Sequence, residues 1–272
     1  MLELARSGLT QSTHPSTSVR AREATPALVV SLARDAGELE AVQRLRYQVF
    51  TEDMGAVFPG HAQGLDQDAF DQWCEHVIVR ESTEGRIVGT YRILTPEQAR
   101  RAGRYYTESE FDIGALDPIR SGLVEVGRSC VHPDYRQGAA IMLLWSGVAE
   151  VLRRGAYRYV LGCASVSLRD DGAQAAEVWR QVASHLQDSP CPRVRPIHRY
   201  PVERLDRSLP AKVPPLIKGY LKLGARVCGE PAWDPDFNTA DLPVLLDVCH
   251  MDARYKRHLQ LEYTPRLPPG AQ

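Results

Sequence analysis

The sequence predicts an α/β fold in which helices pack on the faces of a central, twisted, mixed β-sheet. Strand-like and helix-like segments alternate through the middle of the 272-residue chain, as in an α/β sheet covered by helices. Hydrophobic residues make up 43% of the chain, which is enough to bury a sizeable core. We expect a flexible N-terminal tail over residues 1–26, which is rich in Ser, Thr and Arg, and a single domain over residues 27–272.

The first half of the chain predicts three strands and two helices. Residues 28–32 form a short apolar run typical of a strand, and residues 36–54 carry apolar side chains at helical spacing. A Gly- and Asp-rich loop follows. Residues 76–80 and 87–94 then read as two strands joined by a turn, and residues 96–104 read as a short basic helix.

The second half continues the alternation. Residues 124–131 predict a strand, residues 139–154 a helix that ends at Gly155, and residues 159–164 a buried strand. Further on, prolines break the pattern into an extended connection. The other expected elements are helices over 172–186 and 216–223 and strands over 225–233 and 244–248.

Composition argues against several kinds of protein. A net charge of −1 does not suggest a nucleic-acid-binding protein. The six cysteines form no Cys-x-x-Cys pair, so we expect neither a zinc site nor another metal centre. The N-terminus lacks the apolar stretch of a signal peptide, and no run approaches the roughly 20 apolar residues that cross a bilayer. We therefore expect a cytoplasmic protein that can still contact the inner membrane peripherally.

Several charged residues occur within segments whose other residues are expected to serve only the fold. Each of these residues, taken alone, is typical of an ordinary salt bridge at the end of a sheet. Three carboxylates and three arginines together exceed what a sheet interior tolerates, because buried charge is costly unless it is paired. A bulge at Gly127 would bring Glu125 and Arg128 to the same side of their strand. We expect these residues to form one functional network: Arg46, Asp68, Asp71, Arg92, Glu125 and Arg128.

With Phe50, this set resembles the signature of the acyl-homoserine-lactone synthases, including the spacings Asp-x-x-Asp and Glu-x-x-Arg. That family has the GNAT fold and takes acyl groups from acyl-carrier protein. The chain departs from it by being longer and by lacking a tryptophan shortly after Phe50. It resembles more closely the bacterial ornithine N-acyltransferases that make lyso-ornithine lipid, and the resemblance covers roughly residues 28–258. The sequence segments on which this resemblance rests include Gly162-Cys163-Ala164-Ser165 and Asp236-Phe237-Asn238-Thr239.

The resemblance implies a GNAT-like acyltransferase that moves a fatty acyl group, with or without a 3-hydroxyl, from acyl-carrier protein to the amine of ornithine. An enzyme for another amino acid, or an acyl-homoserine-lactone-type synthase, is the nearest rival. An inactive GNAT-like domain that binds acyl-carrier protein or lipid is a rival of another class. The loop Arg136-Gln137-Gly138-Ala139 carries fewer glycines than is usual for coenzyme A enzymes, which favours a carrier-protein donor.

Specific roles follow for the residues. Glu125 is the candidate general base, because the attacking amine must lose a proton. Tyr220 resembles the GNAT tyrosine that protonates the leaving thiolate, although a half-buried tyrosine on an amphipathic helix is an equal alternative. The acceptor is expected to contact Arg46, Phe50, Asp68, Asp71, Arg92 and Arg128, and the carrier's phosphopantetheine to contact Val131, Arg136, Gly138 and Ala139. No cofactor is implied beyond the thioester donor.

Overall fold

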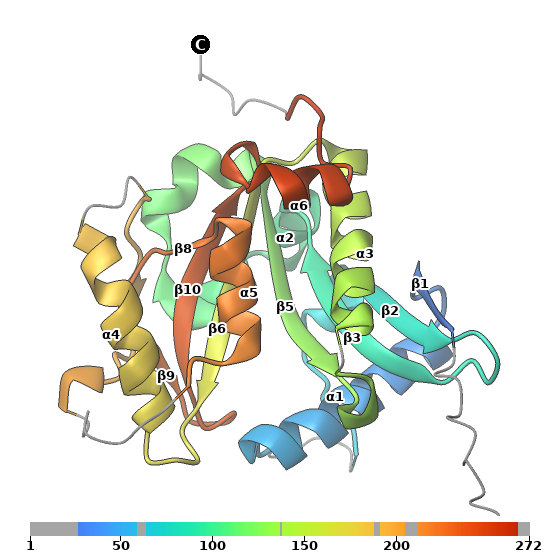
Figure 1. The fold of residues 1–272 in the computed structure, drawn as a ribbon, viewed down its shortest axis with the longest axis horizontal. Coiled ribbons are helices and arrows are strands. Elements are labelled where there is room, and N and C mark those ends of the chain that lie inside the picture. The colour runs from blue at the N-terminus through green and yellow to red at the C-terminus, as the bar shows by residue number, and fades with distance from the viewer. Residues whose placement is uncertain (1–26, 59–63, 137, 188–190, 205–211, 266–272) are drawn as a thin grey trace, which may run out of the picture.

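The chain forms two β-sheets and six α-helices within residues 27–58, 64–136, 138–187, 191–204 and 212–265, which the structure describes (Figure 1). The protein's structure is a computed structural model. The main sheet contains β1 (Leu28–Leu32), β2 (Glu75–Glu81), β3 (Ile87–Leu94), β5 (Leu123–Val131), β6 (Tyr159–Ser167), β8 (Arg226–Val227), β9 (Ala232–Asp234) and β10 (Thr239–Asp247). A small second sheet pairs β4 (Phe111–Asp112) with β7 (Arg195–Pro196). The helices are α1 (Ala36–Met54), α2 (Pro96–Ala102), α3 (Ala139–Gly155), α4 (Ala173–Gln187), α5 (Pro215–Leu223) and α6 (Ala253–His258).

The strand order in the main sheet is β1-β2-β3-β5-β6-β10-β8, and β9 pairs with β10. β5 and β6 run parallel, whereas the other neighbouring strands run antiparallel. The mixed sheet flanked by helices confirms the α/β class that the sequence predicts. The predicted tail over residues 1–26 lies outside the described residues.

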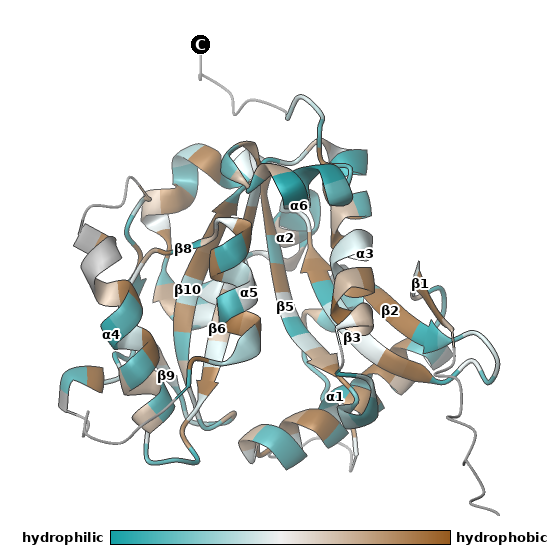
Figure 2. Cartoon of the chain, viewed as in Figure 1, coloured by the Kyte–Doolittle hydropathy of each residue, from teal (hydrophilic) through white to brown (hydrophobic). Residues whose placement is uncertain are grey.

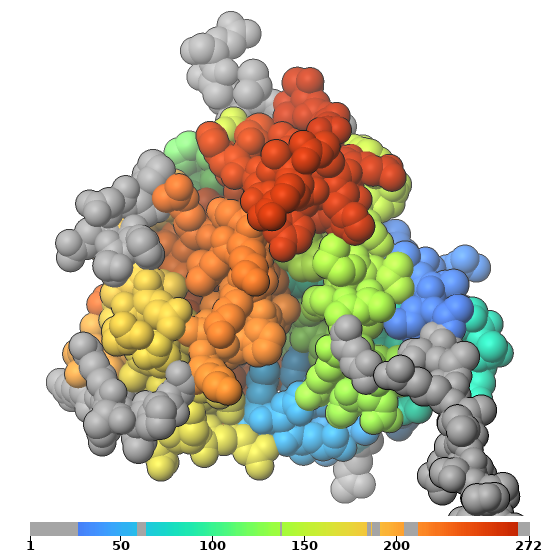
Figure 3. All heavy atoms as spheres, in the orientation of Figure 1, coloured from blue at the N-terminus to red at the C-terminus, as the bar shows by residue number. Residues whose placement is uncertain are grey.

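Alternating side chains of the central strands divide the core into two layers. Val124 and Val160 face the helices α3 and α5, whereas the adjacent Leu123 and Leu161 face the segment that runs from α2 to β5. In Figure 1, α3 and α5 cross the sheet on the side nearer the viewer, and Figure 2 shows that the central strands are largely hydrophobic. α3 and α5 adjoin each other on this surface (Figure 3), and the rings of Trp145 and Tyr220 meet there edge to face.

The parallel strands β5 and β6 pair over only their first three residues and then separate. Their register runs from Leu123 opposite Tyr159 to Glu125 opposite Leu161. Gly162 lies where the two strands part: a Cβ at this position would sit 2.7 Å from the carbonyl oxygen of Val126. Only glycine allows so close an approach of the two backbones.

The structure refines several predicted elements. The strand expected over residues 225–233 is two short strands, because the chain bends between them at Gly229 and Pro231. The 3₁₀ segments η2 (Tyr106–Ser109) and η3 (Gly114–Gly122) and the helix α6 lie where the sequence analysis predicts no helix. None of the helices in the described residues is long and apolar enough to cross a membrane.

We expect Gly162→Ala to destabilise the protein by about 1–3 kcal/mol, because the methyl group pushes β5 and β6 apart. The control is Gly219→Ala in α5, where nothing lies within 4 Å of the added Cβ and helix propensity favours alanine by up to about 1 kcal/mol. Urea unfolding of both variants measures the difference. Equal stability of the two variants would contradict the tight approach at Gly162.

Candidate active site

A pocket occupies the gap between the separating strands. β5 lines it with Val126 to Ser129 and β6 lines it with Gly162 to Ser165. On the helix side its wall is apolar and includes Trp145, Leu216 and Leu223. On the other side its wall includes the polar groups of Thr107 and Glu125. The pocket therefore joins an apolar wall beneath α3 and α5 to a polar wall around Glu125.

Glu125 lies at the base of the gap with its carboxylate buried. The backbone N–H groups of Tyr106 and Thr107 donate to its two oxygens at 2.7 and 2.6 Å, and the Thr107 hydroxyl donates to one of them. Burial raises the pKa of Glu125 above its usual range, although these hydrogen bonds oppose the shift. A carboxylate held rigidly at the pocket wall with a raised pKa has the properties of a general base.

Tyr220 reaches the pocket from α5. Its hydroxyl lies 2.9 Å from the hydroxyl of Tyr91 on β3, and both side chains line the pocket. Burial raises the pKa of Tyr220 to about 12, so the phenol stays protonated near neutral pH. A neutral phenol in a pocket can donate a proton to a departing thiolate.

Three arginines and three aspartates form a buried network beside the pocket. Arg46 has no exposed surface; its guanidinium donates to Asp66 and Asp71 at 2.9 Å. Arg92 pairs with Asp68 at 2.6 Å and with Asp71 at 2.9 Å. Burial alone would raise the pKa of Asp71, but Arg46 and Arg92 outweigh it and hold that pKa well below its usual range. The six charges are thus mutually compensated.

Arg128 completes the network through an irregularity in β5. Its φ of 51° is left-handed, and the pairing of β3 with β5 shifts register there. The bulge thus falls one residue later than the predicted Gly127. It directs Arg128 toward Asp66 and Asp68, both at 3.2 Å, and over the rings of Tyr106 and Phe237. Among the described residues Glu125 has no ion pair, so it is not joined to Arg128 within the charge network.

Phe50 contributes an apolar wall. Phe50 is buried on α1 and lines the pocket. Its ring packs edge to face against that of Phe237, with the ring centroids 5.6 Å apart. α1 begins after Asp35, whose side chain accepts from the N–H of Glu38, and ends at Gly55 with a left-handed φ of 72°. This helix therefore carries both Phe50 at the pocket and Arg46 in the charge network.

The predicted carrier loop lies at the N-terminus of α3. Gly138 caps the helix with a φ of 102°, and no side chain of the described residues makes a capping hydrogen bond to the first turn. Arg136 donates to the carbonyl of Val131 at 3.0 Å and pairs with Asp53 at 2.6 Å. Uncapped N–H groups at a helix N-terminus favour an anion such as a phosphodiester.

Comparison with known proteins identifies the family. Residues 45–146 match the family described as an acetyltransferase (GNAT) domain. An L-ornithine N(alpha)-acyltransferase of Rhodobacter capsulatus is 37% identical over 88% of this chain and 95% of that protein. One of Agrobacterium fabrum is 36% identical over 84% of this chain and 83% of that protein. The chain belongs to the L-ornithine N(alpha)-acyltransferase family. It is an acyltransferase.

Solved structures confirm the family's fold. The acyl-homoserine lactone synthase BjaI superposes with a TM-score of 0.50 at 14% identity, over 89% of this chain and 96% of that chain. FeeM, an N-acyl amino acid synthase from uncultured soil microbes, superposes with a TM-score of 0.50 at 13% identity, over 83% of this chain and 92% of that chain. The predicted GNAT-like architecture is therefore confirmed.

In this family member the predicted catalytic and acceptor-binding residues separate into two groups, apart from the predicted carrier-binding residues at the N-terminus of α3. Phe50, Arg92, Glu125, Arg128 and Tyr220 line the pocket. Arg46, Asp68 and Asp71 lie behind the pocket wall in the charge network, where their charges are already paired.

Sequence reasoning missed Asp66. It is buried and bridges Arg46 and Arg128. The signal in the sequence that could have identified Asp66 is its position two residues before Asp68. Sequence reasoning also missed Thr107, whose hydroxyl and N–H hold Glu125; no local pattern marks it.

We expect Arg46→Met to cost about 3–5 kcal/mol of stability, because the change leaves two buried carboxylates short of a cation. The control is Arg180→Met, which removes an exposed i,i+3 pair with Glu177 and should cost about 0–1 kcal/mol. Urea unfolding of both variants at one pH compares them. A loss at Arg46 no larger than that at Arg180 would show that the network does not support the fold.

Proposed function

We propose that the protein transfers a 3-hydroxy fatty acyl group from acyl-carrier protein to the α-amine of ornithine, which gives lyso-ornithine lipid. The single observation that carries the proposal is family membership at 37% identity across 88% of the chain. The pocket supports it, since it joins an apolar channel under α3 and α5 to a chamber that contains a buried carboxylate. No metal or redox group takes part in the proposed reaction.

The chemistry needs a base, a polarised carbonyl and an acid. In the proposed reaction the α-ammonium first loses a proton to solvent, the neutral nitrogen attacks the thioester carbon, and Glu125, directly or through a water, accepts the proton that the nitrogen releases on attack. The carbon–sulfur bond then breaks. Tyr220, whose hydroxyl lies 2.9 Å from that of Tyr91, donates its proton to the departing thiolate, and the proton held by Glu125 returns to the tyrosinate by way of solvent after the products leave.

The oxyanion of the tetrahedral intermediate needs hydrogen-bond donors. The separation of β5 from β6 after Glu125 leaves edge backbone groups of β5 without partners on β6. N–H groups at this edge are the proposed donors. Arg92 and Arg128, whose side chains also line the pocket, add positive potential nearby.

The proposed donor site is the N-terminus of α3, with Val131, Arg136, Gly138 and Ala139 around the phosphodiester. Other arginines that could attract an acidic carrier do not all lie there. Arg153 and Arg154 stand at the opposite end of α3, about 25 Å away by the rise of a 17-residue helix. Docking of the carrier at the phosphodiester therefore depends on the groups around Arg136.

Contact with the inner membrane stays a prediction, supported by the amphiphilic product. The helix α5 does not supply a free apolar face for it. Ile217 and Leu223 are buried in the core, while Lys218 and Lys222 are exposed. Any membrane contact by this helix would therefore rely on its lysines and anionic lipid.

The direct test of the proposal supplies 3-hydroxyacyl-carrier protein and a panel of single amino acids, and follows thiol release together with product mass. We expect N-acylornithine to form faster than any other product, and acyl-coenzyme A to be the poorer donor. Thiol release with glycine or another amino acid, but none with ornithine, would reject the ornithine acceptor. No amine-dependent release at all would favour an inactive binding domain.

We expect Glu125→Gln to lower turnover by about 10²- to 10⁴-fold, because the amide cannot accept the amine proton. Binding of the carrier protein should stay nearly intact, because the proposed phosphodiester site lies at α3. Thr107→Val is the companion variant: it removes one hydrogen bond to Glu125 but keeps the carboxylate. Melting temperature is measured in the same preparations. A folded Glu125→Gln variant with near-normal turnover would remove Glu125 from the mechanism.

A further inference from the structure

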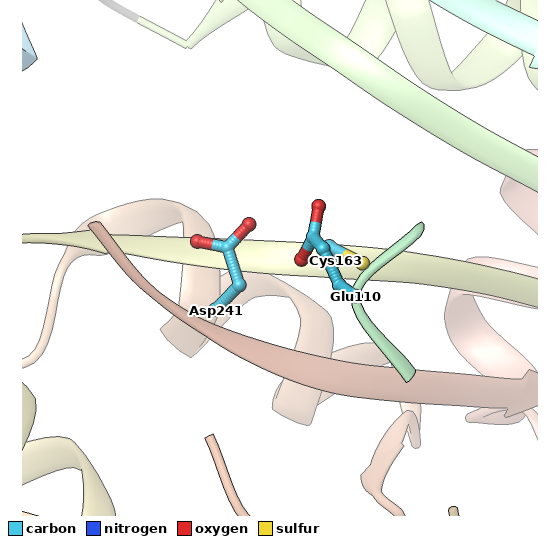
Figure 4. A group of neighbouring side chains, drawn as sticks. All are labelled: Glu110, Cys163 and Asp241. Carbon is cyan, nitrogen blue, oxygen red and sulfur yellow. The ribbon is translucent and has the colours of Figure 1, made fainter. Parts of the chain in front are cut away.

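Two buried carboxylates face each other next to the pocket, and no arginine, lysine or histidine among the described residues pairs with either of them. Glu110 follows η2 and Asp241 lies on β10, and both converge on Cys163 of β6 (Figure 4). The carboxylate oxygens and the sulfur all lie within 4.8 Å of one another. Glu110 is 8% exposed and Asp241 is 4% exposed. Asp234 adds a third negative group nearby.

This group differs from the charge network around Arg46. No ion pair of the described residues includes Glu110, Asp234 or Asp241. Within the part of the chain that the structure describes, both oxygens of Glu110, one oxygen of Asp241 and the buried hydroxyl of Thr239 have no hydrogen-bond partner of suitable distance and angle. Burial raises the pKa of Glu110 well above its usual range and that of Asp241 to about 6, and the neighbouring carboxylates add to the shift at Glu110. Such a group gains stability when a cation enters.

The cluster is connected to the proposed base. Asp241, Asp234 and Cys163 line the same pocket as Glu125. The Cys163 thiol lies 3.8 Å from the Thr107 hydroxyl, which in turn donates to Glu125. A ligand that places one nitrogen at Glu125 can therefore extend a second cationic group toward Glu110 and Asp241.

We propose that Glu110 and Asp241 bind the side-chain ammonium of a diamino-acid acceptor while its α-amine lies at Glu125. The inference rests on the proposed function and names the residues that select the acceptor. Five bonds separate the two nitrogens of ornithine, which gives about 6 Å in the extended form. The α-amine must be neutral to attack the thioester, whereas the side-chain amine stays charged. A reaction at the α-position therefore needs an anionic site that binds the side-chain ammonium away from the base.

A metal ion fits the cluster less well than an ammonium group. Thiol ligands bind metals as thiolates, and burial together with the nearby carboxylates raises the pKa of Cys163 well above its usual range. An ammonium group, in contrast, donates three hydrogen bonds, and the unsatisfied oxygens of Glu110 and Asp241 can accept them.

The test compares ornithine with norvaline, which is the same amino acid without the δ-amine. Wild-type enzyme, Glu110→Gln, Asp241→Asn and the control Asp236→Asn are assayed with the same acyl-carrier protein. Asp236 is an exposed carboxylate near the same strand.

We expect wild type and Asp236→Asn to prefer ornithine over norvaline by at least about 10²-fold in kcat/KM, because removing the amine leaves buried polar groups unpaired. Glu110→Gln and Asp241→Asn should reduce that preference roughly tenfold or more, chiefly through KM for ornithine.

Thermal stability distinguishes this role from a purely structural one. If the carboxylates await a ligand, Glu110→Gln and Asp241→Asn should melt at or above the wild-type temperature, and ornithine should raise the melting temperature of wild type and Asp236→Asn but not of these two variants. An unchanged preference for ornithine in both folded variants overturns the inference but leaves the proposed function intact. Wild-type enzyme that does not acylate ornithine overturns the proposed function itself. Loss of activity with a chelator and recovery with Zn²⁺ would instead assign the cluster to a metal.

Discussion

The separation of β5 from β6 is the constraint on which the rest of the site depends. The two strands pair from Leu123 to Glu125 and then part, and Gly162 allows the close approach from which they diverge. The gap opens a passage through the sheet, with α3 and α5 on one side and the segment around η2 on the other. An acyl chain and an amine can thus approach the same carbon from opposite faces, while the unpaired edge of β5 supplies donors for the oxyanion.

The charge network gives this gap rigid walls. Arg46 on α1, Arg92 on β3 and Arg128 on β5 meet three aspartates of a single loop, so one cluster connects four parts of the chain. All six charges are paired, which explains how they persist in a buried setting. Arg92 and Arg128 present their outer faces to the pocket as well, so the network both supports the fold and shapes the potential at the reacting centre.

Much of the fold could be predicted because its strands and helices have clear periodicity. The residues 36–54 and 87–94 form a helix and a strand with the predicted bounds. The charged signature was visible because arginine and aspartate are rare within apolar segments. The partners could not be predicted, because they are set by contacts between distant segments: Asp66 rather than Glu125 pairs with Arg128, and Thr107 holds Glu125. Glu110 and Asp241 lie 131 positions apart in the sequence and meet only in the folded chain.

The central claim is that the acyl chain and the amino acid occupy opposite sides of the gap between β5 and β6. A crystal structure of the enzyme with N-(3-hydroxyacyl)ornithine tests this most directly. We expect the acyl chain beneath α3 and α5 beside Trp145, the amide nitrogen beside Glu125, and the δ-ammonium between Glu110 and Asp241. A product whose ornithine group lies instead at Asp68 and Asp71, with Arg46 displaced from its partners, would contradict this arrangement.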